Sequence, residues 1–145
     1  MRRLVVAACL MAGLPAAAAA PAAVPTAVPA AASAQQVESG RRLFARCAGC
    51  HEVGPTARNV FGPHLNGVLG RQAGSVPGYA YSPALKNARI VWDARRLAAF
   101  IDDPDEVVPG NKMRFFSFMN ARQVADIVAY LGTQRAVPTM PPPAR

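Results

Sequence analysis

The chain has 145 residues, which is enough for one domain and short for two. Its composition is 52% hydrophobic, although alanine inflates that figure, and its formal net charge is +8 from 16 basic and 8 acidic residues. From residue 35 onward, 14 basic and 8 acidic residues leave a charge of +6, which favours acidic partners. No nucleic-acid-binding motif accompanies this charge, so we expect no nucleic acid among the partners.

The N-terminal segment, residues 1–34, has the features of an export signal. A positively charged start precedes a short apolar run, and an Ala/Pro-rich stretch follows. An A-x-A pattern predicts cleavage after Ala34, with an earlier cut near Ala20 as the alternative. Cys9 follows "VAA", as in a lipoprotein signal, but the apolar run before it is very short, so removal with the signal is favoured. Export predicts a periplasmic protein, with a membrane tether only if this segment is retained.

The rest of the chain predicts an all-α fold with no substantial sheet. A first helix is expected over residues 36–47, and Gly40 within it would let the first and last helices approach closely, with Tyr130 against Phe44. A second helix is expected to begin after the N-cap Asp93 and to end at Pro104. A last helix is expected to begin at Asn120, where a glutamine three residues later completes a capping box. Its apolar positions recur with helical spacing at Val124, Ile127, Val128 and Leu131.

Between the first two helices lies a Gly/Pro-rich stretch, residues 52–91, for which little regular structure is expected. Such a long irregular stretch is uncommon in a compact domain, unless it wraps something that supplies the missing core. A proline-rich tail, residues 137–145, ends the chain. The expected folded domain therefore spans residues 35–136.

The hexapeptide RCAGCH at residues 46–51 limits the chemistry of this domain. A thiol redox pair at Cys47 and Cys50 would need a βαβ context, and no strand-rich run flanks it. A structural zinc site needs four ligands, and only His64 could join the two cysteines and His51. The order C-x-x-C-H instead predicts covalent attachment of a c-type haem, with two thioethers to the porphyrin and the adjacent imidazole on the iron.

An iron held by His51 still has one axial position to fill. The candidates are His64, Met113, Met119 and Met140. Pro109 and Gly110 predict a turn just before Met113, and an extended segment after that turn can lay a side chain across a flat face. The other methionines precede a helix or lie in the proline-rich tail. The turn favours Met113 and leaves the others open.

Residues 37–133 resemble class I cytochrome c, in particular its mitochondrial and bacterial c2-like branch. The matching segments occur in the family's order and cover about two-thirds of the chain. They are GRRLFARCAGCH, GPHLNGVLGR, GYAYSPALKN, IVWDARRLAAFIDDP, VPGNKM and ADIVAYL. The resemblance implies helices and long loops wrapped around one covalently bound haem c.

The resemblance also implies roles for individual residues. Cys47 and Cys50 would carry the haem, and His51 and Met113 would bind the iron. The carbonyl of Pro63 would accept a hydrogen bond from the His51 imidazole. The remaining haem contacts that it implies are Arg71, Tyr81, Trp92 and Asn111. The plainer alternatives are that the two aromatic residues only fill the core and that the arginine is a solvated loop charge.

With both axial positions filled, the iron has no site for a substrate, so we expect a one-electron carrier and not an enzyme. Its partners would be redox proteins with acidic docking faces, such as a bc1-type complex, a terminal oxidase or a photosynthetic reaction centre, and a monomer is expected. Two alternatives remain open. One is a haem subunit dedicated to a single dehydrogenase, and the other is a peroxidase or gas-binding haem protein in which the methionine dissociates easily.

Basic residues are expected to surround the exposed haem edge. They are Arg46, Lys112 and Arg114, and Arg58 would extend the patch. The acidic run DDPDE, residues 102–106, should make this face lopsided. Opposite charges across a transient interface mainly raise the association rate, so the reaction with an acidic partner should slow as salt is added.

Overall fold

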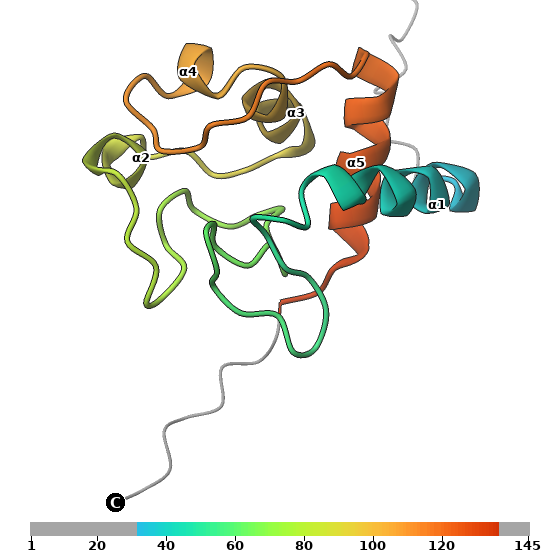
Figure 1. Cartoon of the computed structure of the whole chain (residues 1–145), viewed down its shortest axis with the longest axis horizontal. Helices are drawn as coiled ribbons and strands as arrows, with labels where there is room; N and C mark the ends of the chain where they lie inside the picture. The colour runs from blue at the N-terminus through green and yellow to red at the C-terminus, as the bar shows by residue number, and fades with distance from the viewer. Residues whose placement is uncertain (1–31, 137–145) are drawn as a thin grey trace, which may run out of the picture. The chain divides into compact units, whose positions relative to one another are not determined.

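The computed structural model describes residues 32–136, and its regular structure there is helical (Figure 1). In chain order the elements are α1 (Ala34–Leu43), a 3-10 turn (Phe44–Arg46), α2 (Pro83–Asn87), α3 (Ala94–Asp102), α4 (Pro104–Val107) and α5 (Ala121–Thr133). The only extended pairing within this range is an isolated antiparallel bridge between Gln72 and Val91. The predicted all-α fold is confirmed.

The three longest helices begin at capped N-termini. The side chains of Ser33, Asp93 and Asn120 each accept a hydrogen bond from the backbone N–H three residues on, at 3.2, 2.7 and 3.0 Å. Ser33 and Asn120 are completed by capping boxes, in which a glutamine side chain returns a bond to the cap. The predicted starts after Asp93 and Asn120 are therefore confirmed.

Other helix boundaries differ from the prediction. Helix α1 begins at Ala34, two residues earlier than expected, and gives way to the 3-10 turn after Leu43. Pro104 does not simply end a helix, because it occupies the first turn of α4, which Asp103 caps. The irregular stretch 52–91 contains α2, which was not predicted. Residues 1–31 and 137–145, with Cys9 and Met140, lie outside the described residues, so the predicted signal and tail remain predictions.

Helices α1 and α5 cross in close contact, with the first lying against the side of the second (Figure 1). A Cβ atom at Gly40 would overlap the backbone carbonyl of Asp126, so the two backbones touch at this point. One turn further on, the rings of Phe44 and Tyr130 are 5.5 Å apart between centroids. Both the close approach at Gly40 and this aromatic pair were predicted, and both are confirmed.

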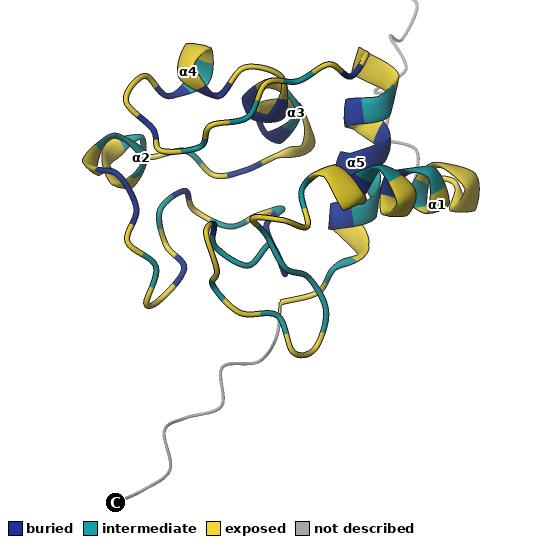
Figure 2. Ribbon diagram, viewed as in Figure 1, coloured by how far each residue is buried: buried dark blue, intermediate teal, exposed yellow. Residues whose placement is uncertain are grey.

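Buried residues are concentrated in α3, in α5 and in the loops beside them (Figure 2). They include Val68, Trp92, Leu97, Phe100, Ile127, Val128 and Leu131. Further buried residues lie in the long loops between the 3-10 turn and α2. No helix within residues 32–136 has the length and apolarity needed to cross a bilayer.

Candidate functional site

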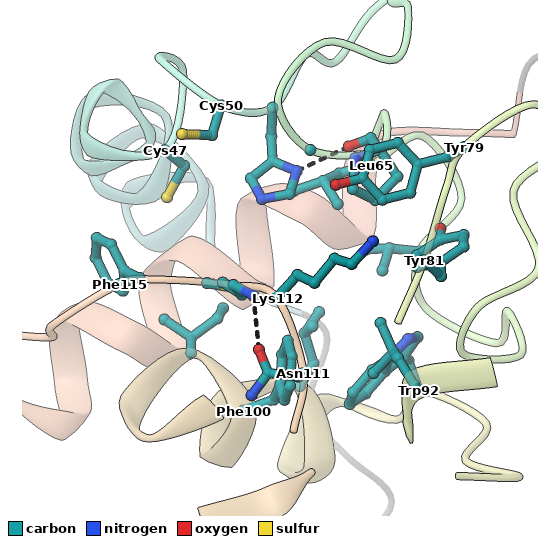
Figure 3. A pocket seen from close by; sticks show the side chains of 18 of the residues that line it. Cys47, Cys50, Leu65, Tyr79, Tyr81, Trp92, Phe100, Asn111, Lys112 and Phe115 are labelled. Atoms are coloured by element: carbon teal, nitrogen blue, oxygen red, sulfur yellow. Dashed lines mark hydrogen bonds between the residues drawn. The ribbon is translucent and has the colours of Figure 1, made fainter. Parts of the chain in front are cut away.

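One cavity of about 410 Å3 brings together residues that are far apart in the sequence (Figure 3). It is bounded by the 3-10 turn, the long loops, α3, the segment before α5, and α5 itself. All nine residues singled out from the sequence line it. They are Cys47, Cys50, His51, Pro63, Arg71, Tyr81, Trp92, Asn111 and Met113.

The two cysteines and the histidine lie on one tight turn. The backbone N–H groups of Cys50 and His51 both donate to the carbonyl of Cys47, at 3.0 and 2.9 Å. Residues three and four apart on such a turn present their side chains on the same side. Burial, followed by the neighbouring Cys50, raises the pKa of the Cys47 thiol to about 11, against the opposing effect of Arg46. The Cys47 thiol is therefore neutral at neutral pH.

The His51 imidazole is held by a backbone carbonyl. Its Nδ1 lies 2.8 Å from the carbonyl oxygen of Pro63, and because a carbonyl can only accept, Nδ1 carries the proton. Nε2 is then the nitrogen with a free lone pair. Gly62 leaves room for the ring, since a Cβ there would overlap it. Burial lowers the pKa of His51, the bond to Pro63 opposes this, and Arg71 lowers the pKa further.

A turn at residues 108–111 presents Met113. Gly110 has a φ of +81°, as the third residue of a type II turn requires, and the N–H of Asn111 closes the turn at 3.1 Å. The Asn111 side chain, only 2% exposed, accepts a bond from the Met113 N–H at 2.7 Å. Its amide donates to the carbonyl at the start of the turn at 3.0 Å and to Asp105 at 2.9 Å. Asn111 thus fixes the Met113 backbone to the turn that precedes it.

Of the candidate axial ligands within residues 32–136, Met113 lines the cavity and His64 and Met119 do not. Met119 is 7% exposed and belongs to the core around α5. The buried Nδ1 of His64 has no hydrogen-bond partner. Position alone therefore separates Met113 from the other two.

Arg71, Tyr81 and Trp92 form another part of the lining. The Arg71 guanidinium donates to the backbone carbonyls of Asn66 and His64, at 2.9 and 3.2 Å, so it is not a freely solvated charge. Tyr81 and Trp92 are buried, and burial raises the pKa of the Tyr81 hydroxyl. In Figure 3 these two aromatic residues lie on the other side of the cavity from the cysteines.

Two further lining residues tie the loops together, a role that the sequence did not predict for them. Lys112 donates from Nζ to the carbonyl of Ala80 at 3.2 Å. The Tyr79 hydroxyl donates to the carbonyl of Phe61 at 2.7 Å. Both contacts join segments distant in the chain, and the only signal in the sequence is a pair of tyrosines in a Gly/Pro-rich loop.

The cavity fits a haem. Its volume is within the range of about 300–1,000 Å3 that is usual for cofactor sites. Its wall is largely apolar, with Leu65, Val68, Leu85, Leu97, Phe100, Ile101, Ile127 and Leu131. Two thiols, a neutral imidazole with a free Nε2 and a thioether border this apolar space. This set of donors is that of a c-type haem protein.

Comparison with known proteins gives the same class. The cytochrome c family model matches residues 37–135, and the chain belongs to the cytochrome c family. It is accordingly a carrier of single electrons between respiratory or photosynthetic complexes, and it binds haem c covalently.

The relatives include bacterial cytochromes. Cytochrome c2 of Rhodomicrobium vannielii is 45% identical over 66% of this chain and 76% of its own. Cytochrome c-550 of Nitrobacter winogradskyi is 42% identical over 66% and 86%. Among solved structures, cytochrome cH from Methylobacterium extorquens is 41% identical, with a TM-score of 0.63 over 67% of this chain and 97% of that one.

Proposed function

We propose that His51 and Met113 are the axial ligands of the haem iron and that Cys47 and Cys50 form its thioethers. The observation that carries this assignment is position. Among the candidates within the described residues, these are the ones that border the cavity. Haem supplies a one-electron couple between ferric and ferrous iron, and ligation by histidine and methionine raises its potential. With both axial positions taken by the protein, the chain acts as a carrier and not as an enzyme.

The residues around the ligands limit how far the ligands move. Pro63 sets the proton on Nδ1 of His51 and thereby directs Nε2 to the metal. Asn111 holds the N–H of Met113 through a buried side chain. A site that keeps its geometry in both oxidation states loses little energy to rearrangement when an electron arrives or leaves. We assign Arg71, Tyr81 and Trp92 to the haem propionates, because buried carboxylates require polar partners.

We propose that the protein works in the periplasm as a monomer. Its positively charged start, apolar run and Ala/Pro-rich stretch support export. The Ser33 cap of α1 supports processing before Ser33 rather than after Ala34, since the later cut would remove the cap. Its partners are redox complexes with acidic docking faces, such as a bc1-type complex, a terminal oxidase or a reaction centre.

The absorption spectrum of the purified ferric holoprotein tests the ligation. We expect low-spin iron with a thioether-to-ferric charge-transfer band at neutral pH, and slow reaction with added cyanide. A high-spin spectrum and rapid cyanide binding would contradict the saturated site and support a peroxidase or gas-binding protein instead.

A further inference from the structure

The segment between the turn and α5, residues 112–120, is extended, and its side chains alternate. Those at odd positions, from Met113 to Met119, are buried or partly buried, and those at even positions are exposed. Such alternation places every second side chain on one face of the chain. The cavity is lined by consecutive residues of this segment, from Lys112 to Phe115. Where it borders the cavity, at residues 112–115, the segment is therefore a wall one chain thick between the cavity and the solvent, and residues 116–119 continue the same extended chain beyond the cavity.

The outer face of this segment, just beyond the part that borders the cavity, carries two exposed aromatic side chains. Phe116 is 81% exposed and Phe118 is 90% exposed. Two residues apart on an extended chain, they are about 7 Å from each other on the same face. Single exposed apolar residues are ordinary, whereas exposed apolar side chains that form one patch are a feature of interaction sites. We call Phe116 and Phe118 the aromatic ridge.

The charges around the ridge indicate what covers it. Lys112 and Arg114 precede it on the same exposed face. Beside them lie exposed carboxylates of α3 and α4, with Arg114 Nη1 3.6 Å from Asp105 Oδ2. An anionic lipid surface would attract the cations and repel the acidic residues 102–106. A face of mixed charge around an apolar centre fits another protein, whose charges can be complementary at each point.

A transient redox partner fits better than a second copy of this chain. A lasting homodimer across the wall would cover a barrier to the cavity that is one chain thick at residues 112–115. A carrier needs that barrier free for a donor and then for an acceptor. Transient redox interfaces are small, below about 1,200 Å2, so two aromatic side chains of about 150–250 Å2 each contribute much of the apolar area.

We propose that the aromatic ridge is the apolar contact on which a redox partner protein docks, with an apolar recess of the partner over Phe116 and Phe118 and its acidic side chains facing Lys112. The inference rests on the proposed carrier function. In each encounter one electron crosses the wall, either from the donor to the oxidised protein or from the reduced protein to the acceptor. The ridge contributes affinity and orientation and takes no part in binding the haem.

The double variant Phe116→Ser, Phe118→Ser of the holoprotein tests the ridge. Washed membranes from the cells that encode the protein would supply the acceptor, and the oxidation rate would be followed by haem absorbance. We expect the second-order rate constant to fall about tenfold, which corresponds to about 1.4 kcal/mol. The loss should be the same at low ionic strength and at about 0.15 M, because salt does not screen an apolar contact. Val91→Ser is the control, since Val91 is 49% exposed and does not line the cavity.

Two measurements on the double variant separate a loss of docking from damage to the haem site. The midpoint potential and the oxidation by ferricyanide should be unchanged, since both depend on the haem site and not on docking. If the membranes oxidise the variant and the wild type at equal rates, the ridge is not the docking contact, and the carrier function is unaffected. A wild-type holoprotein that reacts with ferricyanide but not with the membranes would count against the carrier function as well.

Two further outcomes would assign the ridge to another occupant and overturn the proposal. One is binding of the wild type, but not of the variant, to vesicles of phosphatidylglycerol and phosphatidylcholine. The other is sedimentation of the wild type as a dimer and of the variant as a monomer.

Discussion

At the residue scale, the protein controls the chemistry of His51 through burial and one hydrogen bond. Burial lowers its pKa, which keeps the imidazole neutral at neutral pH. The Pro63 carbonyl then decides which nitrogen holds the proton. Because the acceptor is a backbone atom, a side-chain substitution at Pro63 leaves it in place. The tautomer is therefore encoded in the path of the loop and not in one side chain.

Replacing Met113 with alanine removes the proposed second ligand. The thioether-to-ferric band should disappear, the midpoint potential should fall, and cyanide should bind quickly, as absorbance and redox titration would show. Met119→Ala is the matched control, because Met119 is buried away from the cavity. It should cost about 2–5 kcal/mol of unfolding free energy while the band remains. The opposite pattern in the two variants would contradict the assignment.

The proposed thioethers at Cys47 and Cys50 can be tested after the fold is destroyed. Covalently attached haem should stay with the denatured protein through acid–organic extraction, and the intact mass should include it. The variant Cys47→Ser, Cys50→Ser should release any haem that it binds. Partition of the wild-type haem into the organic phase would rule out the attachment.

His64 should make the protein sensitive to acid. Burial, followed by repulsion from Arg71, lowers the pKa of His64, and its buried Nδ1 has no acceptor. The unfolded chain therefore binds a proton at His64 more readily than the folded one, so stability present above about pH 6.5 is lost as the pH falls. Denaturant unfolding at about pH 7.5 and about pH 5 should show a smaller loss for His64→Gln than for the wild type. Equal losses would mean that His64 does not contribute.

At the element scale, local signals account for the parts of the fold that the sequence predicts. Asp93 and Asn120 cap their helices through bonds to backbone three residues away, so a short stretch of sequence contains the whole interaction. Helices α2 and α4 have five and four residues, and each begins at a proline. A proline in the first turn of a helix looks, in sequence, like a proline that ends one, which is why Pro104 was expected only to end a helix. Helix α2 lies in the Gly/Pro-rich stretch 52–91, whose composition indicated irregular structure.

The residues of the candidate site also fall into two groups, those fixed by local sequence and those fixed by contacts between distant segments. The Cys-Cys-His turn is local and specific, so its residues were identified directly. The bond from Lys112 to Ala80 spans 32 residues, and that from Tyr79 to Phe61 spans 18. Such contacts depend on the course of irregular loops, which no periodicity encodes. Lys112 was accordingly predicted as a docking charge, and its hydrogen bond across the loops was not foreseen.

Gly40→Ala should weaken the crossing of α1 and α5. The new Cβ would overlap the backbone of Asp126, which is itself part of a helix and cannot move alone. Overpacking costs about 1–3 kcal/mol, and each kcal/mol lowers the melting temperature of a small domain by about 4–8 °C. Thermal unfolding followed by circular dichroism would measure this. Gln35→Ala, at an exposed position of α1, should leave the melting temperature nearly unchanged, and a stable Gly40→Ala variant would argue against tight contact.

At the scale of the whole molecule, the positive charge is unevenly placed around the cavity. Arg46, Lys112 and Arg114 line it and are exposed. The acidic residues of α3 and α4 lie to one side, and the exposed pair Arg114–Asp105 contributes at most about 1 kcal/mol. The electrostatic field at this face is therefore positive on one side and negative on the other. A partner with complementary charges would be steered into one orientation as it approaches.

Ionic strength should separate this steering from the contact made by the aromatic ridge. Salt screens exposed charges over about 8 Å at 0.15 M, so the wild-type rate with an acidic oxidase or reductase should fall as salt is added and then level off at the part that apolar contact sustains. Arg46→Glu and Lys112→Glu should slow the reaction at low salt, with the absorption spectrum intact, and the difference from wild type should shrink as salt rises. Arg135→Glu makes the same charge change beyond the end of α5, away from the haem cavity, and should matter much less. Stopped-flow rates across a salt series would measure all three. Equal effects at Arg135 and Arg46, or a rate that ignores salt, would show that the cavity face is not where charge guides the partner, while the protein would remain a carrier.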